Sequence, residues 1–498
     1  MNIAQAKEYI KESVQMYLKK DEYGDYRIPL VRQRPIFLLG APGIGKSAIM
    51  EQIARELDIA LVGYSMTHHT RQSALGLPFI TEKEYGGSKF EVSEYTMSEI
   101  IASIYETIKE SGVKEGILFL DEINCVSETL YPSMLQFLQF KTFGRHRVPD
   151  GWVIVTAGNP PQYNKSVREF DVVTLDRLKV LKVTEDYQTW RKYAADSGIH
   201  SAITGFLDGD KDSFYHIAAT AEGNTYVTAR GWEDLSEIIY MYEESNLPVT
   251  EELIGQYIQC DSIVKDFSAY YDLYVKYKTM FDANDVLKGV YDSASVDAIR
   301  EASLDEKIAL VGILLDGIKS NEKDIVNLQD MLKKVRGLVV KLKDGGDVQK
   351  GIDDAILAWK KVLDSKEKAG TLGTDEKRDI RRVIAFYEEV QKDCGTDGTK
   401  LAENYMNRVS ALKSLVADEQ ERLHNAFDFM KMVFGVDSNE MVIFVTELTV
   451  NRTTSTFLST FGSSDYDECN EILMIGNREE KLRAEIEQLF GDEQVGNN

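Results

Sequence analysis

The chain has 498 residues, of which 43% are hydrophobic and 28% charged, and this composition describes a globular protein with more than one core. Its formal net charge of −24 repels the phosphate backbone of nucleic acids, so a general nucleic-acid binder is disfavoured. The four cysteines lie far apart and form no CxxC pair, which argues against a zinc site or a disulfide framework and suits the cytoplasm. Because no apolar run is long enough to span a membrane, we expect no membrane segment.

The first 185 residues alternate short apolar, β-branched runs with helical stretches. After an amphipathic N-terminal helix, we expect strands at residues 35–40, 60–65, 116–121, 152–158 and 178–183. Short strands separated by helices of ten or more residues predict an α/β fold with a parallel five-stranded sheet. Ligands of such sheets bind at the C-terminal ends of the strands, so chemistry is expected there.

The rest of the chain is predicted to be mainly helical. Within the first part, residues 77–95 alternate apolar and polar side chains around Gly86 and Gly87, which predicts a hairpin insertion. We expect an α/β core over residues 1–185, a helical lid over 186–258 and an all-α accessory or partner-binding domain over 259–498.

The turn after the first predicted strand satisfies the phosphate-loop pattern G-x-x-x-x-G-K-[ST]. Its glycines allow backbone N–H groups to surround phosphates, and the positive end of the following helix points at them. Lys46 is expected to reach the β- and γ-phosphates of ATP, and the Ser47 hydroxyl to bind Mg²⁺. The predicted ATP-binding residues of this loop are Gly40, Ala41, Pro42, Gly43, Ile44, Gly45, Lys46 and Ser47.

Polar side chains also follow the third and fourth predicted strands. The third strand ends in Asp121, which suits the Mg²⁺ site, and Glu122, which is placed to polarise the water that attacks the γ-phosphate. Asn159 follows the fourth strand, where it either orients that water or forms a turn before Pro160. The acid pair favours ATP hydrolysis over nucleotide storage.

These motifs, in this order, resemble an AAA+ module and, within that superfamily, its MoxR branch. Residues 121–124 match the Asp-Glu-Ile-Asn box of the branch, and residues 144–152, followed by 157–160, are similar to its next conserved block. Residues 70–78 look like the segment that leads into the insertion this clade carries in its second helix, which would account for the hairpin. The resemblance covers roughly residues 30 to 245.

The resemblance implies roles for three residues. Asn159 takes the role called sensor 1, and Arg230 matches the sensor 2 arginine at the start of a lid helix. Arg177 matches the arginine finger, which reaches into the site of a neighbouring subunit. The family usually has Phe where this chain has Leu178, and Arg168 of the same loop region is the alternative finger. An ordinary surface ion pair is the alternative interpretation of either arginine.

A finger that acts in trans implies a homo-oligomeric ring, usually of six subunits. The resemblance therefore implies an ATPase that remodels or activates a protein partner, as a chaperone does, and members of the branch often act with a protein carrying a von Willebrand factor A domain. Two alternatives stay open: a nucleic-acid-stimulated motor similar to helicases or restriction subunits, and a scaffold whose assembly is gated by ATP.

Overall fold

A computed structural model describes residues 1–68, 71–164, 166–220, 223–291, 293–343, 345, 347–394 and 397–473. The contacts between Cα atoms divide these residues into two compact units. The sheet unit consists of Met1–Thr189, Thr228–Arg230 and Gln349–Asp393. The helical unit consists of Trp190–Val227, Gly231–Val348 and the described residues from Cys394 onward.

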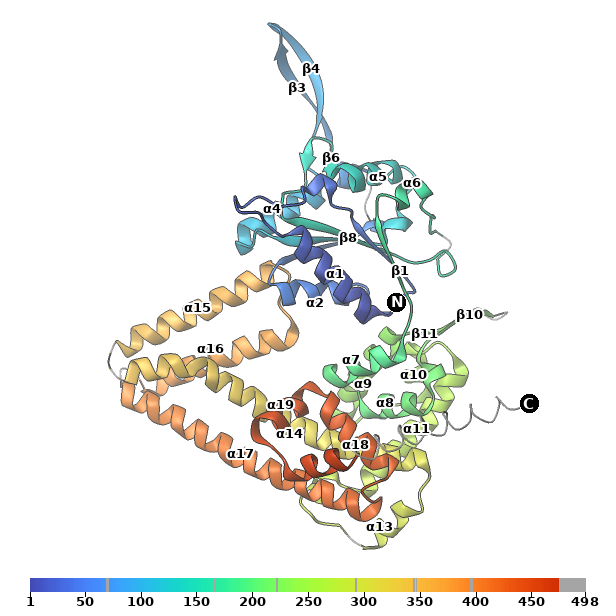
Figure 1. Cartoon of the computed structure of the whole chain (residues 1–498), viewed down its shortest axis with the longest axis vertical. Coiled ribbons are helices and arrows are strands. Elements are labelled where there is room, and N and C mark those ends of the chain that lie inside the picture. The colour runs from blue at the N-terminus through green and yellow to red at the C-terminus, as the bar shows by residue number, and fades with distance from the viewer. Residues whose placement is uncertain are drawn as a thin grey trace, which may run out of the picture. The chain divides into compact units, whose positions relative to one another are not determined.

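The sheet unit is built on a parallel sheet of five strands (Figure 1). The strands are β1 (Ile36–Gly40), β2 (Ala60–Ser65), β5 (Gly116–Asp121), β8 (Trp152–Gly158) and β9 (Lys179–Val183). Their spatial order is β2-β5-β8-β1-β9, and the apolar runs of β5 and β8 are buried almost throughout, as a sheet covered on both faces requires. The predicted α/β fold with a parallel five-stranded sheet is therefore confirmed.

Six helices of the first 189 residues accompany this sheet. They are α1 (Ile3–Tyr17), α2 (Ala48–Leu57), α3 (Arg71–Leu75), α4 (Glu99–Ser111), α5 (Tyr131–Phe140) and α6 (Val172–Leu175). The N-terminal helix α1 begins with a capping box between Asn2 and Gln5, and its apolar face, spaced as a helix requires, is fully buried. The short 3₁₀ turns η1 (Leu30–Arg32) and η3 (Ile123–Cys125) precede β1 and follow β5.

A two-stranded antiparallel hairpin interrupts the strand–helix alternation. Its strands are β3 (Pro78–Tyr85) and β4 (Ser88–Tyr95), joined at Gly86 and Gly87, which both have positive φ angles. The hairpin projects from the sheet unit, away from the five strands (Figure 1), and exposes apolar side chains such as Ile80 and Phe90. A smaller hairpin, β6 (Thr142–Phe143) and β7 (His146–Arg147), follows α5.

Two helices from the C-terminal half pack with the sheet unit, namely α15 (Val348–Lys368) and α16 (Thr374–Cys394). Their connection docks on the edge strand β2, where the Leu61 N–H donates to the Ala369 carbonyl at 2.9 Å. A Cβ on Gly370, which has a φ of +69°, would lie 2.6 Å from the Leu61 carbonyl oxygen, so this approach requires glycine. Residues 349–393 therefore belong with the sheet by their contacts, whereas the sequence assigned the whole of 259–498 to a separate domain.

The helical unit contains one hairpin among its helices. The hairpin, β10 (His216–Thr220) with β11 (Gly223–Val227), lies within the range 186–258, for which the sequence predicted helix alone. That prediction is wrong for β11, where Thr225, Tyr226 and Val227 are residues that favour strands. In the described part of the chain no helix has the length and apolar character of a membrane span.

The two longest helices of this unit, α14 (Leu304–Lys343) and α17 (Gly398–Val433), pack against each other, and several of the other helices contact them. The others are α7 (Tyr187–Ser197), which enters the unit at Trp190, α8 (Ser201–Gly209), α9 (Ala229–Glu244), which enters it at Gly231, α10 (Glu251–Tyr257), α11 (Asp261–Met280), α12 (Ala283–Leu287), α13 (Ser293–Arg300), α18 (Asn439–Val450) and α19 (Arg452–Phe461). The expected all-α character of the C-terminal half is confirmed.

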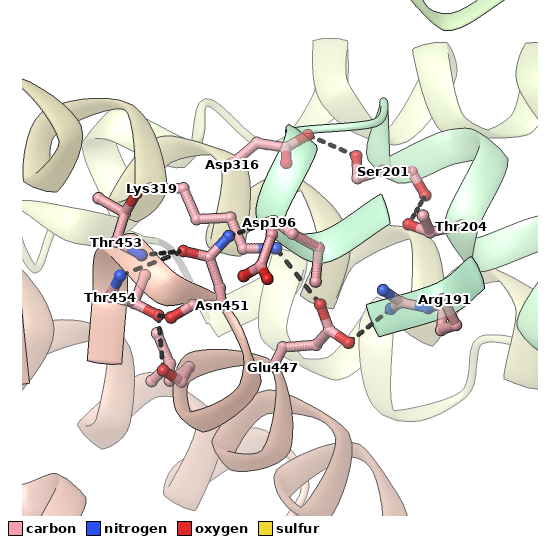
Figure 2. A network of polar contacts seen from close by, with 12 residues as sticks. Arg191, Asp196, Ser201, Thr204, Asp316, Lys319, Glu447, Asn451, Thr453 and Thr454 are labelled. Atoms are coloured by element: carbon pink, nitrogen blue, oxygen red, sulfur yellow. Dashed lines mark hydrogen bonds and ion pairs between the residues drawn. The ribbon is translucent and has the colours of Figure 1, made fainter. Parts of the chain in front are cut away.

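A polar network joins three of these helices (Figure 2). Glu447 of α18 accepts hydrogen bonds from Arg191 of α7 at 2.5 Å and from Lys319 of α14 at 3.3 Å. Asn451 caps α19 by accepting from the N–H groups of Thr453 and Thr454. Because these charged groups satisfy one another, the network stabilises the packing of the helices.

Candidate nucleotide site

Lys46 lies at the C-terminal end of β1, inside the loop that connects this strand to α2. Its side chain is buried, and its ammonium group donates to the carbonyl oxygens of Gly40 and Ala41 at 2.9 and 2.7 Å and to Asn159 Oδ1 at 2.9 Å. Burial lowers the pKa of Lys46 to about 8, and the positive charge of Arg230 adds to this lowering. The negative charges of Asp121 and Glu122 act in the opposite direction. A buried cation that is hydrogen-bonded to neutral oxygens is suited to receive an anion.

The glycines of the loop give its backbone the shape that a phosphate cradle needs. Gly43 and Gly45 have φ angles of +71° and +91°, in the region that favours glycine. A Cβ on Gly43 would lie 2.8 Å from Thr228 Cβ, so this close approach also requires glycine. The predicted loop residues 40–47 thus form a compact turn between a strand and a helix N-terminus.

Ser47 and Asp121 meet at the start of α2. The Ser47 hydroxyl donates to Asp121 Oδ2 at 2.9 Å. A hydroxyl beside a carboxylate offers the oxygen ligands that Mg²⁺ prefers, so the pair fits the predicted metal site. Ser47 and Asp121 are 74 positions apart in the sequence, and the order of the strands in the sheet brings them together.

Glu122 is held in a defined position beyond the end of β5. Its φ angle of 54° is unusual for a residue other than glycine, and its N–H donates to Asp121 Oδ1 at 2.8 Å. Glu122 Oε2 accepts from the hydroxyl groups of Ser65 at 2.8 Å and Thr67 at 3.1 Å. Two hydroxyls at the end of β2 therefore fix the carboxylate that the sequence proposed as the general base.

Asn159 lies after β8, beside the buried lysine. Its side-chain oxygen accepts from Lys46, and its backbone carbonyl oxygen accepts from Asn124 Nδ2 at 2.8 Å. Asn124 is itself buried, and a Cβ on Gly158 would lie 2.3 Å from its Oδ1, so the amide packs directly against the end of β8. The structure places Asn159 between β5 and β1, next to the position expected for the γ-phosphate.

Arg230 also lies near the phosphate loop. It stands in the first turn of α9, its N–H donates to the Gly43 carbonyl at 3.3 Å, and its charge acts on Lys46. The structure thus brings Arg230 to the same end of the sheet as the acid pair.

The two candidate arginine fingers lie in different surroundings. Arg168 donates its N–H to the Asn124 carbonyl at 2.8 Å, and its guanidinium pairs with Glu128. Arg177 lies two residues before the start of β9, at the N-terminal end of the sheet, and its exposed guanidinium donates to Gln139 at 2.9 Å. Because the phosphate loop lies at the opposite strand end, the structure does not bring Arg177 together with the other predicted residues of its own chain.

The sequence analysis missed three residues that contact the predicted groups: Ser65, Thr67 and Asn124. The rule that ligands bind at strand ends could have identified Ser65, which ends β2. No periodicity or spacing indicates that Asn124 supports Asn159, because that contact depends on β5 and β8 being neighbours.

Comparison with known families agrees with this geometry. Residues 35–178 match the family model of the AAA domain (dynein-related subfamily), and no curated protein matches the chain significantly. The matched range contains β1, β2, β5 and β8, together with the phosphate loop, the acid pair and Asn159, and it ends directly before β9. The chain carries an AAA+ ATPase domain.

An AAA domain implies nucleotide binding and ATPase activity, and such domains commonly assemble into rings. In the AAA domain of this chain, the polar groups that gather at the C-terminal strand ends can do what that activity requires. A buried lysine lies in the loop where phosphates would bind, a hydroxyl and a carboxylate offer oxygen ligands for a metal ion, and a second carboxylate, held by two hydroxyls, can accept a proton from water.

Proposed function

We propose that this chain is an ATPase of the MoxR kind that forms a ring, usually of six copies, and uses ATP hydrolysis to remodel or activate a protein partner. The observation that carries the proposal is the hydrogen-bonded cluster of Lys46, Asn159, Ser47, Asp121 and Glu122 at one end of an AAA-type sheet. Each member has a distinct task in phosphoryl transfer.

Within the cluster, Lys46 binds the β- and γ-phosphates of ATP in place of the two loop carbonyls that it now contacts. Ser47 and Asp121 hold Mg²⁺, which neutralises phosphate charge when bound. Glu122 accepts the proton of the attacking water, and Asn159 orients that water.

The position of Arg177 supports the proposed ring. An arginine finger must approach the phosphate that is transferred, and Arg177 lies at the strand end opposite its own phosphate loop. We therefore assign it to the site of an adjacent copy, with Arg230 acting in cis. Arg168 is the weaker candidate because Glu128 already pairs with its guanidinium.

The MoxR assignment is supported by the Asp-Glu-Ile-Asn box at residues 121–124, in which Asn124 braces Asn159. The proposed partner is a protein client or a protein with a von Willebrand factor A domain, and the proposed location is the cytoplasm. The exposed hairpin β3–β4, with Tyr85, Lys89 and Phe90 near its tip, would face that partner.

The phosphate loop is tested by Lys46→Ala. We expect this variant to lose ATP binding and turnover, measured by calorimetry and by phosphate release. Lys109→Ala, at an exposed position of α4, is the matched control and should behave as the unmodified chain does. Normal turnover by Lys46→Ala would contradict the proposed site.

The nature of the partner is tested by adding candidate activators to the unmodified chain. A remodelling ATPase should be stimulated by its protein partner and should trap it in the Glu122→Gln variant. Stimulation by DNA or RNA that weakens steeply with salt would favour a nucleic-acid motor instead. Full function of Glu122→Gln would favour a scaffold that needs ATP binding alone.

A further inference from the structure

A recess lies at the end of the sheet opposite the phosphate loop. It has a volume of about 210 Å³ and is lined by residues 31–34, which precede β1, residues 138, 139 and 141 around the end of α5, and residues 176 and 177, which precede β9. Strands β1 and β9 are parallel, with Ile36 opposite Lys179, so these segments meet where both strands begin. All of them belong to the sheet unit.

The recess is basic although the chain as a whole is strongly acidic. Its lining contains four cationic side chains, from Arg32, Arg34, Lys141 and Arg177, and one acidic side chain, from Asp176. Asp176 is largely exposed and lies 4.0 Å from Arg34, at the limit of an ion pair. An exposed contact of this length neutralises little charge.

Lys141 is the buried member of this group. It is 2% exposed, it ends α5 with a φ angle of 59°, and its ammonium group donates to the Leu138 carbonyl. Burial lowers its pKa to about 8, and no carboxylate among the described residues pairs with it. A buried cation that lacks a counter-charge is costly, and an anion bound in the recess would offset that cost.

Apolar side chains that are close in sequence to the lining residues are also exposed. Val31 is 51% exposed, Phe140 follows Gln139 at 46%, and Val172 of the short helix before Asp176 is 82% exposed. Exposed apolar groups around charged ones are typical of a surface that another molecule covers.

We propose that this recess is a second anion site, which binds phosphate-type oxyanions through Arg32, Arg34 and Lys141 beside Arg177. A guanidinium group binds phosphate oxygens through paired hydrogen bonds, and the ammonium group of Lys141 adds a buried positive charge. The inference rests on the proposed function only for the source of the anion. In a ring, the source is the nucleotide on the adjacent copy; otherwise it is a free polyphosphate.

The site itself is tested in the full-length Lys46→Ala variant, which lacks the phosphate-loop lysine. Calorimetry with inorganic tripolyphosphate at low salt should detect binding, and binding should weaken as salt is added. Adding Arg34→Ala or Lys141→Met should weaken it at least about tenfold, whereas Lys109→Ala should not. No binding, or equal binding in all these variants, would overturn the proposal.

Two further measurements separate a loss of anion binding from a loss of fold and from a failure of the proposed function. Lys141→Met removes a buried charge and keeps the volume, so its unfolding temperature should be unchanged or raised, and a loss of binding is then not a loss of fold. Normal ATP turnover by Lys46→Ala would contradict the proposed function and leave the recess measurement intact, so the two failures are distinguishable.

The source of the anion is tested by mixing variants. If the nucleotide of an adjacent copy fills the recess, Arg34→Ala should turn over ATP slowly and should recover on mixing with Lys46→Ala, because one chain supplies the phosphate loop and the other the recess. If Arg34→Ala alone turns over ATP normally while tripolyphosphate binding is lost, the source is free polyphosphate.

Discussion

The two ends of the five-stranded sheet differ in how their charged groups are satisfied. At the C-terminal ends of the strands, Ser47 bonds to Asp121, and Lys46 bonds to Asn159 and to carbonyls of its own loop. At the N-terminal ends, Arg177 donates to the neutral amide of Gln139, and Lys141 has no carboxylate partner within the described chain. The C-terminal strand ends therefore form a site whose charged groups have partners, whereas the N-terminal strand ends form a cationic surface.

This difference suggests how copies of the chain cooperate. Parallel strands present one end to each side of the molecule, so the two surfaces face in opposite directions. We call the C-terminal strand ends, which carry Asp121 and Glu122, the acidic end. A head-to-tail arrangement would place the cationic end of one copy on the acidic end of the next, and such contacts close into a ring when the rotation between copies allows it. The site of each copy would then be completed by its neighbour.

The largest effect is expected from removing Arg177, the cation that the N-terminal strand ends of one copy would contribute to the nucleotide site of the next copy. Arg177→Ala should bind ATP normally and lose about 10³-fold in kcat, because the finger stabilises charge only in the transition state. Phosphate release and nucleotide affinity are the measurements, with Arg168→Ala as the matched control from the same loop region.

Mixing separates a finger in trans from one in cis. Arg177→Ala mixed with Glu122→Gln should recover part of the turnover, because mixed interfaces contain one intact set of groups. If no ratio of the two variants restores turnover, Arg177 does not act on an adjacent copy.

A second prediction concerns the acidic end alone. Asn159→Ala should lower kcat by about 10²-fold with little change in ATP affinity, because a water-orienting amide acts mainly in the chemical step. A loss of ATP affinity with normal kcat would instead assign Asn159 to holding Lys46, which it contacts at 2.9 Å.

A third prediction uses the buried lysine of the acidic end. In the nucleotide-free chain the pKa of Lys46 is about 8, so the side chain loses its charge as the pH rises through that value. Phosphates bind the charged form and therefore raise this pKa, which makes ATP binding take up a proton at high pH. Affinity should be constant well below pH 8 and fall by up to about tenfold per unit above it.

Calorimetry in buffers of different ionisation enthalpy measures this proton uptake directly. The uptake should disappear in Lys46→Arg, because a guanidinium keeps its charge above pH 8 and can still bind phosphates. Equal proton uptake in the two chains would assign it to another residue.

The smallest effect is expected from the hydroxyls that hold the general base. Ser65→Ala should lower kcat by roughly three- to tenfold and leave the KM for ATP unchanged, because Thr67 still holds Glu122 Oε2. Removing both hydroxyls should lower kcat further. An increase in turnover would show that the hydroxyls restrain Glu122 instead of positioning it.

The parts of the fold that follow from local sequence were predictable. The five strands are short apolar runs, and the phosphate loop has a fixed residue spacing between a strand and a helix, so both could be located from the sequence alone. The acid pair was equally visible, because Asp121 and Glu122 directly follow the apolar run of residues 117–120.

The parts that depend on distant contacts were not predictable. The docking of Ala369 on Leu61 joins residues about 300 positions apart, and helical periodicity in α15 and α16 does not indicate which surface they cover. The same holds for the basic recess, where Arg34, Lys141 and Arg177 look like scattered surface charges until β1 and β9 are paired.

The central claim is that Mg-ATP binds on the turn after β1 and is hydrolysed with the acid that follows β5. Its most direct test is to measure ATP affinity and phosphate release side by side for the unmodified chain and for Glu122→Gln. The account predicts equal affinity, with turnover in the unmodified chain and almost none in Glu122→Gln. Turnover that survives Glu122→Gln, or no binding of Mg-ATP by either chain, would contradict it.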